Sequence, residues 1–112
     1  MRIVYLDVEG KITPNDVLVY YYCAARGGRT EGAYHVRKGD TLEYIAEQVA
    51  AGINTHWCQP LFEASANGTR VRVFIKDQAE DVKLGWYIEH IPGAQTMERV
   101  PGGDVALTIT EG

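Results

Sequence analysis

The sequence predicts an α+β fold in which a single helix packs on a mainly antiparallel sheet, in the order β-β-β-α-β-β-β-β. One strongly amphipathic stretch lies near the middle of the chain, and short apolar runs separated by turn residues lie on both sides of it. A lone amphipathic helix can bury its apolar stripe only against another element, and these runs supply a sheet. The chain has the length of one domain, and we expect residues 1–112 to form a single one.

Three strands are predicted before the helix. Near the N-terminus, Ile3, Tyr5 and Val8 alternate with residues that are polar or that belong to the second face of the expected strand. Residues 17–23 are apolar on both faces and rich in β-branched and aromatic side chains, which indicates an interior strand covered on both sides. Residues 24–32 form a glycine-rich connection, typical of a hairpin with a long basic tip. Alternation then resumes over residues 33–37, with Tyr34 and Val36 expected to point inward.

The helix is predicted over about residues 41–53. Asp40 and Glu43 have the spacing of a capping box, in which each side chain bonds the backbone amide of the other residue. Gly52 and Asn54 are residues that commonly end helices. A single apolar stripe is formed by residues at helical spacing, namely Leu42, Ile45, Ala46, Val49, Ala50 and Ile53.

The C-terminal part of the chain reads as four further strands. Asn67-Gly68 predicts a type I′ turn in a hairpin over about residues 61–76. In its second strand the residues expected to face the core are Val71, Val73 and Ile75, and those expected to face away are Arg70, Arg72 and Lys76. After the polar stretch 77–83, strands are expected at residues 85–91 and 105–110.

Composition excludes some functional classes. The 15 acidic residues exceed the 11 basic ones, giving a formal charge of −4, which argues against sequence-independent binding of nucleic acid. No apolar stretch approaches the roughly 18 residues that cross a bilayer, so we expect no membrane partner. Asp7 comes too early for a signal-peptide core, and two cysteines make no disulfide framework. A reduced, cytosolic environment of synthesis is the default.

The residues capable of chemistry are few and dispersed. His56 and Cys58, joined by Cys23 or His90, offer a set of zinc ligands, but the chain has no Cys-x-x-Cys pair of the kind that structural zinc sites use. A Cys58–histidine nucleophile stays an open alternative. The only serine, Ser65, stands outside any nucleophile motif. We therefore expect no enzyme, no catalytic residues, no metal and no cofactor.

The aromatic residues point instead to protein–protein contact. Three consecutive tyrosines in one strand cannot share a face, so at least one must project from the opposite side to its neighbours. If the helix covers only one side, the other exposes tyrosine, which suits an interface. The interface candidates are Tyr20, Tyr21, Tyr22, Arg26, Arg29, Trp57 and Trp86.

A first resemblance covers residues 34–46. Its Gly39-Asp40-Thr41-Leu42 turn and the following Ile45-Ala46 resemble the opening of a LysM domain, a small βααβ module. The second short helix and closing strand of that family have no counterpart in the sequence. The resemblance implies binding to a cell-wall glycan of N-acetylglucosamine, with sugar rings stacked on Trp57, Trp86 or Tyr44.

A second resemblance is longer and covers about residues 3–76. It consists of Gly10-Lys11-Ile12-Thr13-Pro14-Asn15-Asp16-Val17, then Gly39-Asp40-Thr41, Val49-Ala50-Ala51-Gly52-Ile53-Asn54, and Phe62 through Val71 around Asn67-Gly68. This pattern resembles a domain found in contractile tail sheath proteins of bacteriophages. It implies a small non-enzymatic virion protein of the tail, baseplate or neck, made in the host bacterial cytoplasm. Its expected partners are other virion proteins and further copies of itself.

Overall fold

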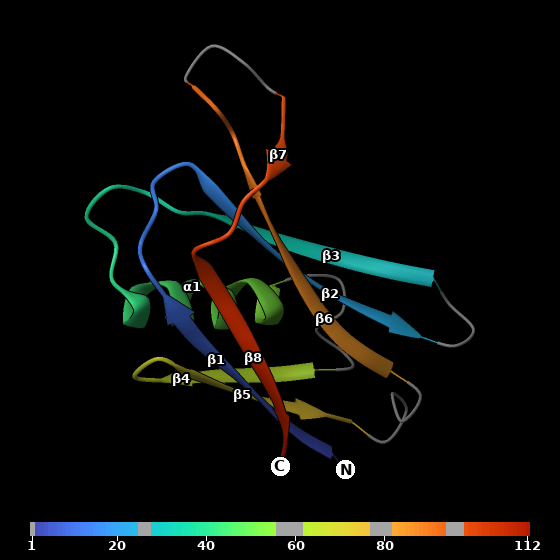
Figure 1. The fold of residues 1–112 in the computed structure, drawn as a ribbon. Coiled ribbons are helices and arrows are strands. Elements are labelled where there is room, and N and C mark those ends of the chain that lie inside the picture. Colours follow the sequence, from blue (N-terminus) through green and yellow to red (C-terminus); the bar gives the residue numbers. More distant parts are fainter. Residues whose placement is uncertain (1, 25–27, 56–61, 77–81, 94–97) are drawn as a thin grey trace.

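The computed structural model describes residues 2–24, 28–55, 62–76, 82–93 and 98–112. Within these residues the chain forms one helix and eight strands (Figure 1), which confirms the predicted α+β class and element order and adds the two-residue strand β7. The elements are β1 (Arg2–Gly10), β2 (Asp16–Ala24), β3 (Gly28–His35), α1 (Leu42–Thr55), β4 (Phe62–Asn67), β5 (Arg70–Ile75), β6 (Val82–His90), β7 (Val100–Pro101) and β8 (Val105–Glu111).

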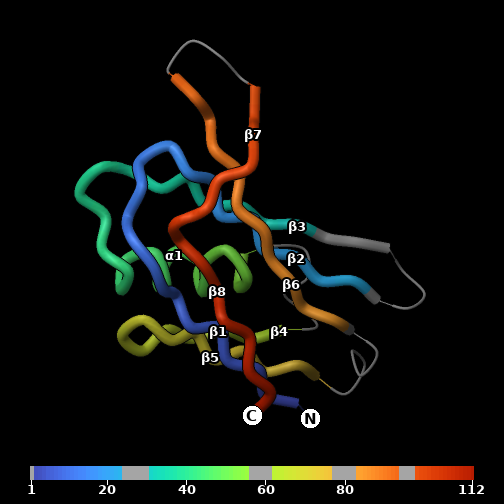
Figure 2. Tube along the Cα trace, in the orientation of Figure 1, coloured from blue at the N-terminus to red at the C-terminus, as the bar shows by residue number. Residues whose placement is uncertain are grey.

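The strands divide into two antiparallel sheets of four strands each. Sheet A has the order β4-β5-β1-β8, and sheet B has the order β3-β2-β6-β7. The sheets meet where β6 lies alongside β8, and α1 contacts both β4 of sheet A and β3 of sheet B (Figures 1 and 2). The helix therefore packs against both sheets, and the core lies between these three layers. None of the helical structure described here is long and apolar enough to cross a membrane.

In β1 and β5, alternate residues face the core. In β1 the buried residues are Val4, Leu6 and Val8, so of the three residues on which the predicted alternation was based only Val8 faces the core. Because side chains alternate along a strand, Ile3 and Tyr5 lie on the opposite face of sheet A. The expected burial is confirmed on β5 and α1, where the core residues are Val71, Val73, Ile75, Ile45, Ala46, Val49, Ala50 and Ile53.

Strand β2 is interior, as predicted, between β3 and β6. Leu18 on the core side and Val17 and Val19 on the other side are all buried. However, β3 begins at Gly28, five residues before the predicted start at residue 33, so much of the expected connection 24–32 is strand. Gly32 lies within it because the Tyr20 ring occupies the space that a β-carbon there would need.

The predicted capping box is wrong. The hydroxyl of Thr41 accepts a hydrogen bond from the Tyr44 amide at 3.1 Å, so Thr41 caps the helix. The Asp40 carboxylate instead accepts from the Arg37 amide at 2.8 Å and from the Tyr34 hydroxyl at 2.6 Å. Burial, together with the bond to Asp40, raises the pKa of Tyr34. Asp40 thus closes the turn before the helix and ties it to β3.

The helix also runs two residues beyond its predicted end, to Thr55. Gly52 does not terminate it. The Tyr20 hydroxyl lies where a β-carbon on Gly52 would be. The close packing of α1 against sheet B therefore explains why this helical position is a glycine. Asn54 is a helical residue whose side chain reaches β4, and the residues expected to stop the helix therefore serve its packing.

The hairpin of β4 and β5 forms as predicted, with a different turn. Asn67 pairs with Arg70, so Gly68 and Thr69 are its central residues. Only Gly68, at φ +63°, has a positive φ, whereas a type I′ turn needs two. The prediction of a type I′ turn centred on Asn67-Gly68 is therefore wrong. The two later strands appear as β6 and β8, and β6 begins at Val82, within the stretch expected to be a polar connection.

Candidate interaction surfaces

The residues proposed for chemistry do not form a cluster in the part of the chain that the structure describes. His56, Trp57 and Cys58 lie outside the described residues, as does Arg26. Elsewhere in the described ranges, no three His, Cys, Asp or Glu side chains come together as metal ligands do. The zinc and Cys58 alternatives therefore gain no support from the described geometry.

One buried polar pair exists where β2 begins and β6 ends. Asp16 is 1% exposed, and its Oδ1 lies 2.7 Å from Nδ1 of His90, which is directly opposite in the sheet. The other carboxylate oxygen, Oδ2, is buried without a hydrogen-bond partner. A β-carbon on Gly102 would lie 3.1 Å from Oδ1 of Asp16, so the backbone directly after β7 lies against the carboxylate. This pair holds the sheet together at its end, and sequence reasoning missed it.

The outer face of sheet B carries a tyrosine pair. We call this surface the tyrosine face, formed by Tyr21, Tyr87 and the neighbouring Glu31 and Gly85. The Tyr21 and Tyr87 rings are 6.2 Å apart between centroids, and the Tyr87 hydroxyl donates to the Glu31 carboxylate at 3.4 Å. The Tyr21 ring lies over Gly85, where a β-carbon would overlap it. Both rings are half-buried.

The three consecutive tyrosines divide between the two faces, as the sequence predicts. Tyr20 points toward Gly52 of the helix, and Tyr22 is 6% exposed with its ring edge-on to Phe62 at 4.9 Å. Tyr22 is therefore a core residue, and its selection as a surface contact is corrected. Tyr21 alone lies on the side away from the helix.

Two further candidates belong to described strands. Trp86 is opposite Tyr20 in the sheet and packs, partly buried, against the core. Arg29 lies on β3, opposite Cys23 in register. Among the candidates whose side chains the structure describes, Tyr20, Tyr22 and Trp86 lie on the core side of sheet B and Tyr21 lies on the other side, so these four do not form one patch.

A second surface lies on the outer face of sheet A, and sequence reasoning did not select it. We call it the arginine face, centred on Tyr5, Arg70, Arg72 and Phe74. The Arg70 guanidinium lies 4.7 Å from the Tyr5 ring centre, and that of Arg72 lies 4.1 Å from the Phe74 ring centre. Arg70, Arg72 and Phe74 are alternate residues of β5, so their side chains project from the same side of the strand. This spacing could have revealed the face from the sequence.

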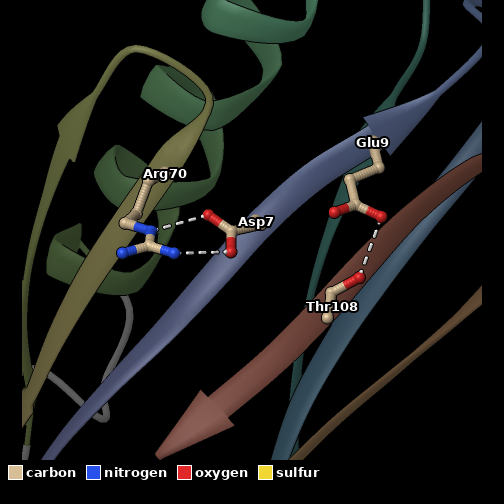
Figure 3. Close-up of polar contacts among 4 residues, drawn as sticks. All are labelled: Asp7, Glu9, Arg70 and Thr108. Carbon is tan, nitrogen blue, oxygen red and sulfur yellow. Dashed lines mark hydrogen bonds and ion pairs between the residues drawn. The ribbon is translucent and has the colours of Figure 1, made fainter. Parts of the chain in front are cut away.

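Polar contacts tie the strands of the arginine face together (Figure 3). Arg70 holds Asp7 with two hydrogen bonds, Nε to Oδ1 at 2.8 Å and a terminal nitrogen to Oδ2 at 3.0 Å. The Thr108 hydroxyl donates to the Glu9 carboxylate at 3.0 Å, which links β8 to β1. The hydrogen bonds and positive charge of Arg70 lower the pKa of Asp7. These contacts link β5 to β1 and β1 to β8 across the arginine face.

Comparison with known proteins gives no relative: no family model, no curated protein and no solved structure matches this chain. Functional inference therefore depends on the two surfaces and on the chemistry of their residues.

Proposed function

We propose that this chain is a non-enzymatic structural protein of a tailed bacteriophage particle, in its tail, baseplate or neck. It acts in the virion through contacts with other virion proteins and with further copies of itself, and it needs no cofactor. The resemblance of residues 3–76 to the sheath domain supports the phage setting. The two outward faces support the mode of action.

One observation carries the proposal furthest. The half-buried pair Tyr21 and Tyr87 lies on the side of sheet B away from both α1 and sheet A. Paired aromatic rings with hydroxyl groups offer a large contact area and polar anchors, and such residues are enriched in the cores of protein interfaces. In a symmetric particle, modest contacts of this kind are repeated around a ring and their effects combine.

The test is whether the protein is a fixed part of the particle. Phage particles produced by a host that carries this gene are purified through a density gradient and washed in high salt. Quantitative mass spectrometry then measures the copies of the chain per particle. We expect several copies in an integral ratio to the other tail proteins, and particles that lack the chain would contradict the proposal.

The alternative, a LysM-like module for cell-wall glycan, has one observation in its favour. Tyr44 is 45% exposed at the start of α1, and its ring lies 6.3 Å from that of Tyr34, so a sugar ring has an aromatic surface to stack on. The described chain nevertheless continues from α1 to the β4–β5 hairpin, and α1 is the only helix in the described ranges.

Pull-down on purified peptidoglycan separates the two functions. Saturable binding that free chitooligosaccharide abolishes, and that Tyr44→Ala removes, favours the glycan module. Lys38→Ala, which changes an exposed residue of the preceding turn, is the matched control. Under the structural proposal neither the wild type nor the variants bind above background.

A further inference from the structure

We propose that the arginine face is the contact between two copies of this chain, related by a two-fold axis, with Arg72 of each copy paired to Glu63 of the other. This inference rests on the proposed function, because it names the surface and the partner through which an assembly protein of this kind associates. It adds a self-contact that neither sequence resemblance implies at these residues.

Of the two arginines that define this face, Arg72 has no acidic partner in the described chain, whereas Arg70 is held by Asp7. Arg72 is exposed and stacks on the half-buried Phe74 ring, and no carboxylate of the described chain forms an ion pair with it. A guanidinium already held flat on an aromatic ring loses little freedom on binding, and arginine is enriched among the residues that dominate interface energies.

Glu63 is the matching anion. It is exposed on β4, its side chain projects from the same face of sheet A, and within the described ranges it too has no ion-pair partner. The register places Glu63 opposite Phe74 and Ser65 opposite Arg72. These four residues are the corners of one quadrilateral, with the two charges on one diagonal and Ser65 and Phe74 on the other.

This arrangement is self-complementary. A two-fold axis in the plane of the face, roughly along the Ser65–Phe74 diagonal, exchanges the two charged corners. Each Arg72 then faces a Glu63 of the second copy, and the two Phe74 rings meet near the axis. An isologous interface requires this reciprocity. Sheets that pack face to face lie about 10 Å apart, close enough for such side chains to touch.

The same arrangement argues against a partner of a single charge. An acidic surface that paired with Arg72 would bring like charge against Glu63, and a basic surface would do the same to Arg72. A second copy satisfies both residues at once. It also covers Phe74, whose apolar surface is only half-buried in one copy.

The test uses charge reversal on the full chain. Sedimentation velocity over a concentration series measures the dimer dissociation constant of the wild type, of Arg72→Glu and of Glu63→Arg. Two variants with the same charge changes on exposed residues elsewhere, Lys38→Glu and Glu47→Arg, are the controls. Circular dichroism and thermal melting establish that every variant is folded.

We expect each reversal on the face to raise the dissociation constant by about tenfold or more, because like charges then meet across the axis. The controls should stay within about threefold of the wild type. An equimolar mixture of Arg72→Glu and Glu63→Arg should form heterodimers, since every facing pair is again opposite in charge. The double variant should dimerise with itself for the same reason.

Two outcomes overturn the inference. In the first, the wild type stays monomeric at every concentration. In the second, the wild type dimerises, but the charge reversals on the face raise the dissociation constant no more than the control variants do. In the second case the chain still associates with itself, and the proposed function stands with a different surface. Absence of the chain from purified particles, in contrast, contradicts the proposed function whatever the dimer constant.

Discussion

Asn54 of α1 makes two hydrogen bonds to the backbone of one residue in the edge strand β4. Its Nδ2 donates to the Ala64 carbonyl at 2.7 Å, and its Oδ1 accepts from the Ala64 amide at 2.8 Å. A neighbouring antiparallel strand would make the same pair of bonds. The helix thereby occupies part of the edge of sheet A, where β4 has no further strand beside it among the described elements.

Replacing Asn54 with alanine should expose how much this contact stabilises the edge. Asn54→Ala leaves the partly buried amide and carbonyl of Ala64 without partners, and we expect the free energy of unfolding to fall by about 1–3 kcal/mol. Urea denaturation measures the loss, and the Ala64 amide should exchange its hydrogen faster. Gln48→Ala removes an amide side chain from the same helix as a control. Equal losses in the two variants would refute the role of Asn54.

Gly52 should respond to substitution in the opposite way from most helical glycines. Gly to Ala in a helix normally stabilises by roughly 1 kcal/mol. Here the new β-carbon meets the Tyr20 hydroxyl, so we expect Gly52→Ala to destabilise by about 1–3 kcal/mol. In a double-mutant cycle, Tyr20→Phe should reduce that cost by removing the hydroxyl. A gain in melting temperature for Gly52→Ala alone would show that the helix and sheet B are farther apart.

The Asp16–His90 pair predicts an asymmetry between single and double variants. His90→Ala leaves a buried carboxylate with neither oxygen bonded, and we expect a loss of about 2–4 kcal/mol in the free energy of unfolding. Adding Asp16→Asn removes the buried charge and should recover part of the loss. Chemical denaturation of the two single variants and the double variant measures the coupling. Strictly additive losses would mean that the two side chains act independently.

The Asp7–Arg70 pair predicts a dependence of stability on acid pH. Its hydrogen bonds hold the pKa of Asp7 below the usual 3.8, so the folded state favours the charged carboxylate. The stabilisation is complete well above pH 3.8 and is lost as the pH falls below that value, where Asp7 takes up a proton. We therefore expect the free energy of unfolding of Asp7→Asn to depend less on pH in this range than that of the wild type. Glu47→Gln on α1, tested in parallel, removes a carboxylate while leaving the Asp7–Arg70 pair in place and serves as the control.

Much of the fold could be predicted because its determinants are local. Helical spacing identified the buried stripe of α1, and alternation along β5 separated Val71 and Val73 from Arg70 and Arg72. The division of the consecutive tyrosines between two faces follows from the period of a strand. The same rule places Arg72 and Phe74 on one side of β5. Only the pairing register of β4 with β5 shows that Glu63 is their neighbour.

The sequence by itself determined the element order, the helix stripe and the face to which most strand residues belong, because these depend on residue spacing alone. The tertiary structure decided the rest: the division into two sheets, the choice of Thr41 as the cap, and the continuation of α1 past Gly52. In each case the deciding partner is distant in the chain or lies in another element. Tyr34 draws Asp40 away from the helix, and Tyr20 fills the space beside Gly52, so local preference yielded to packing.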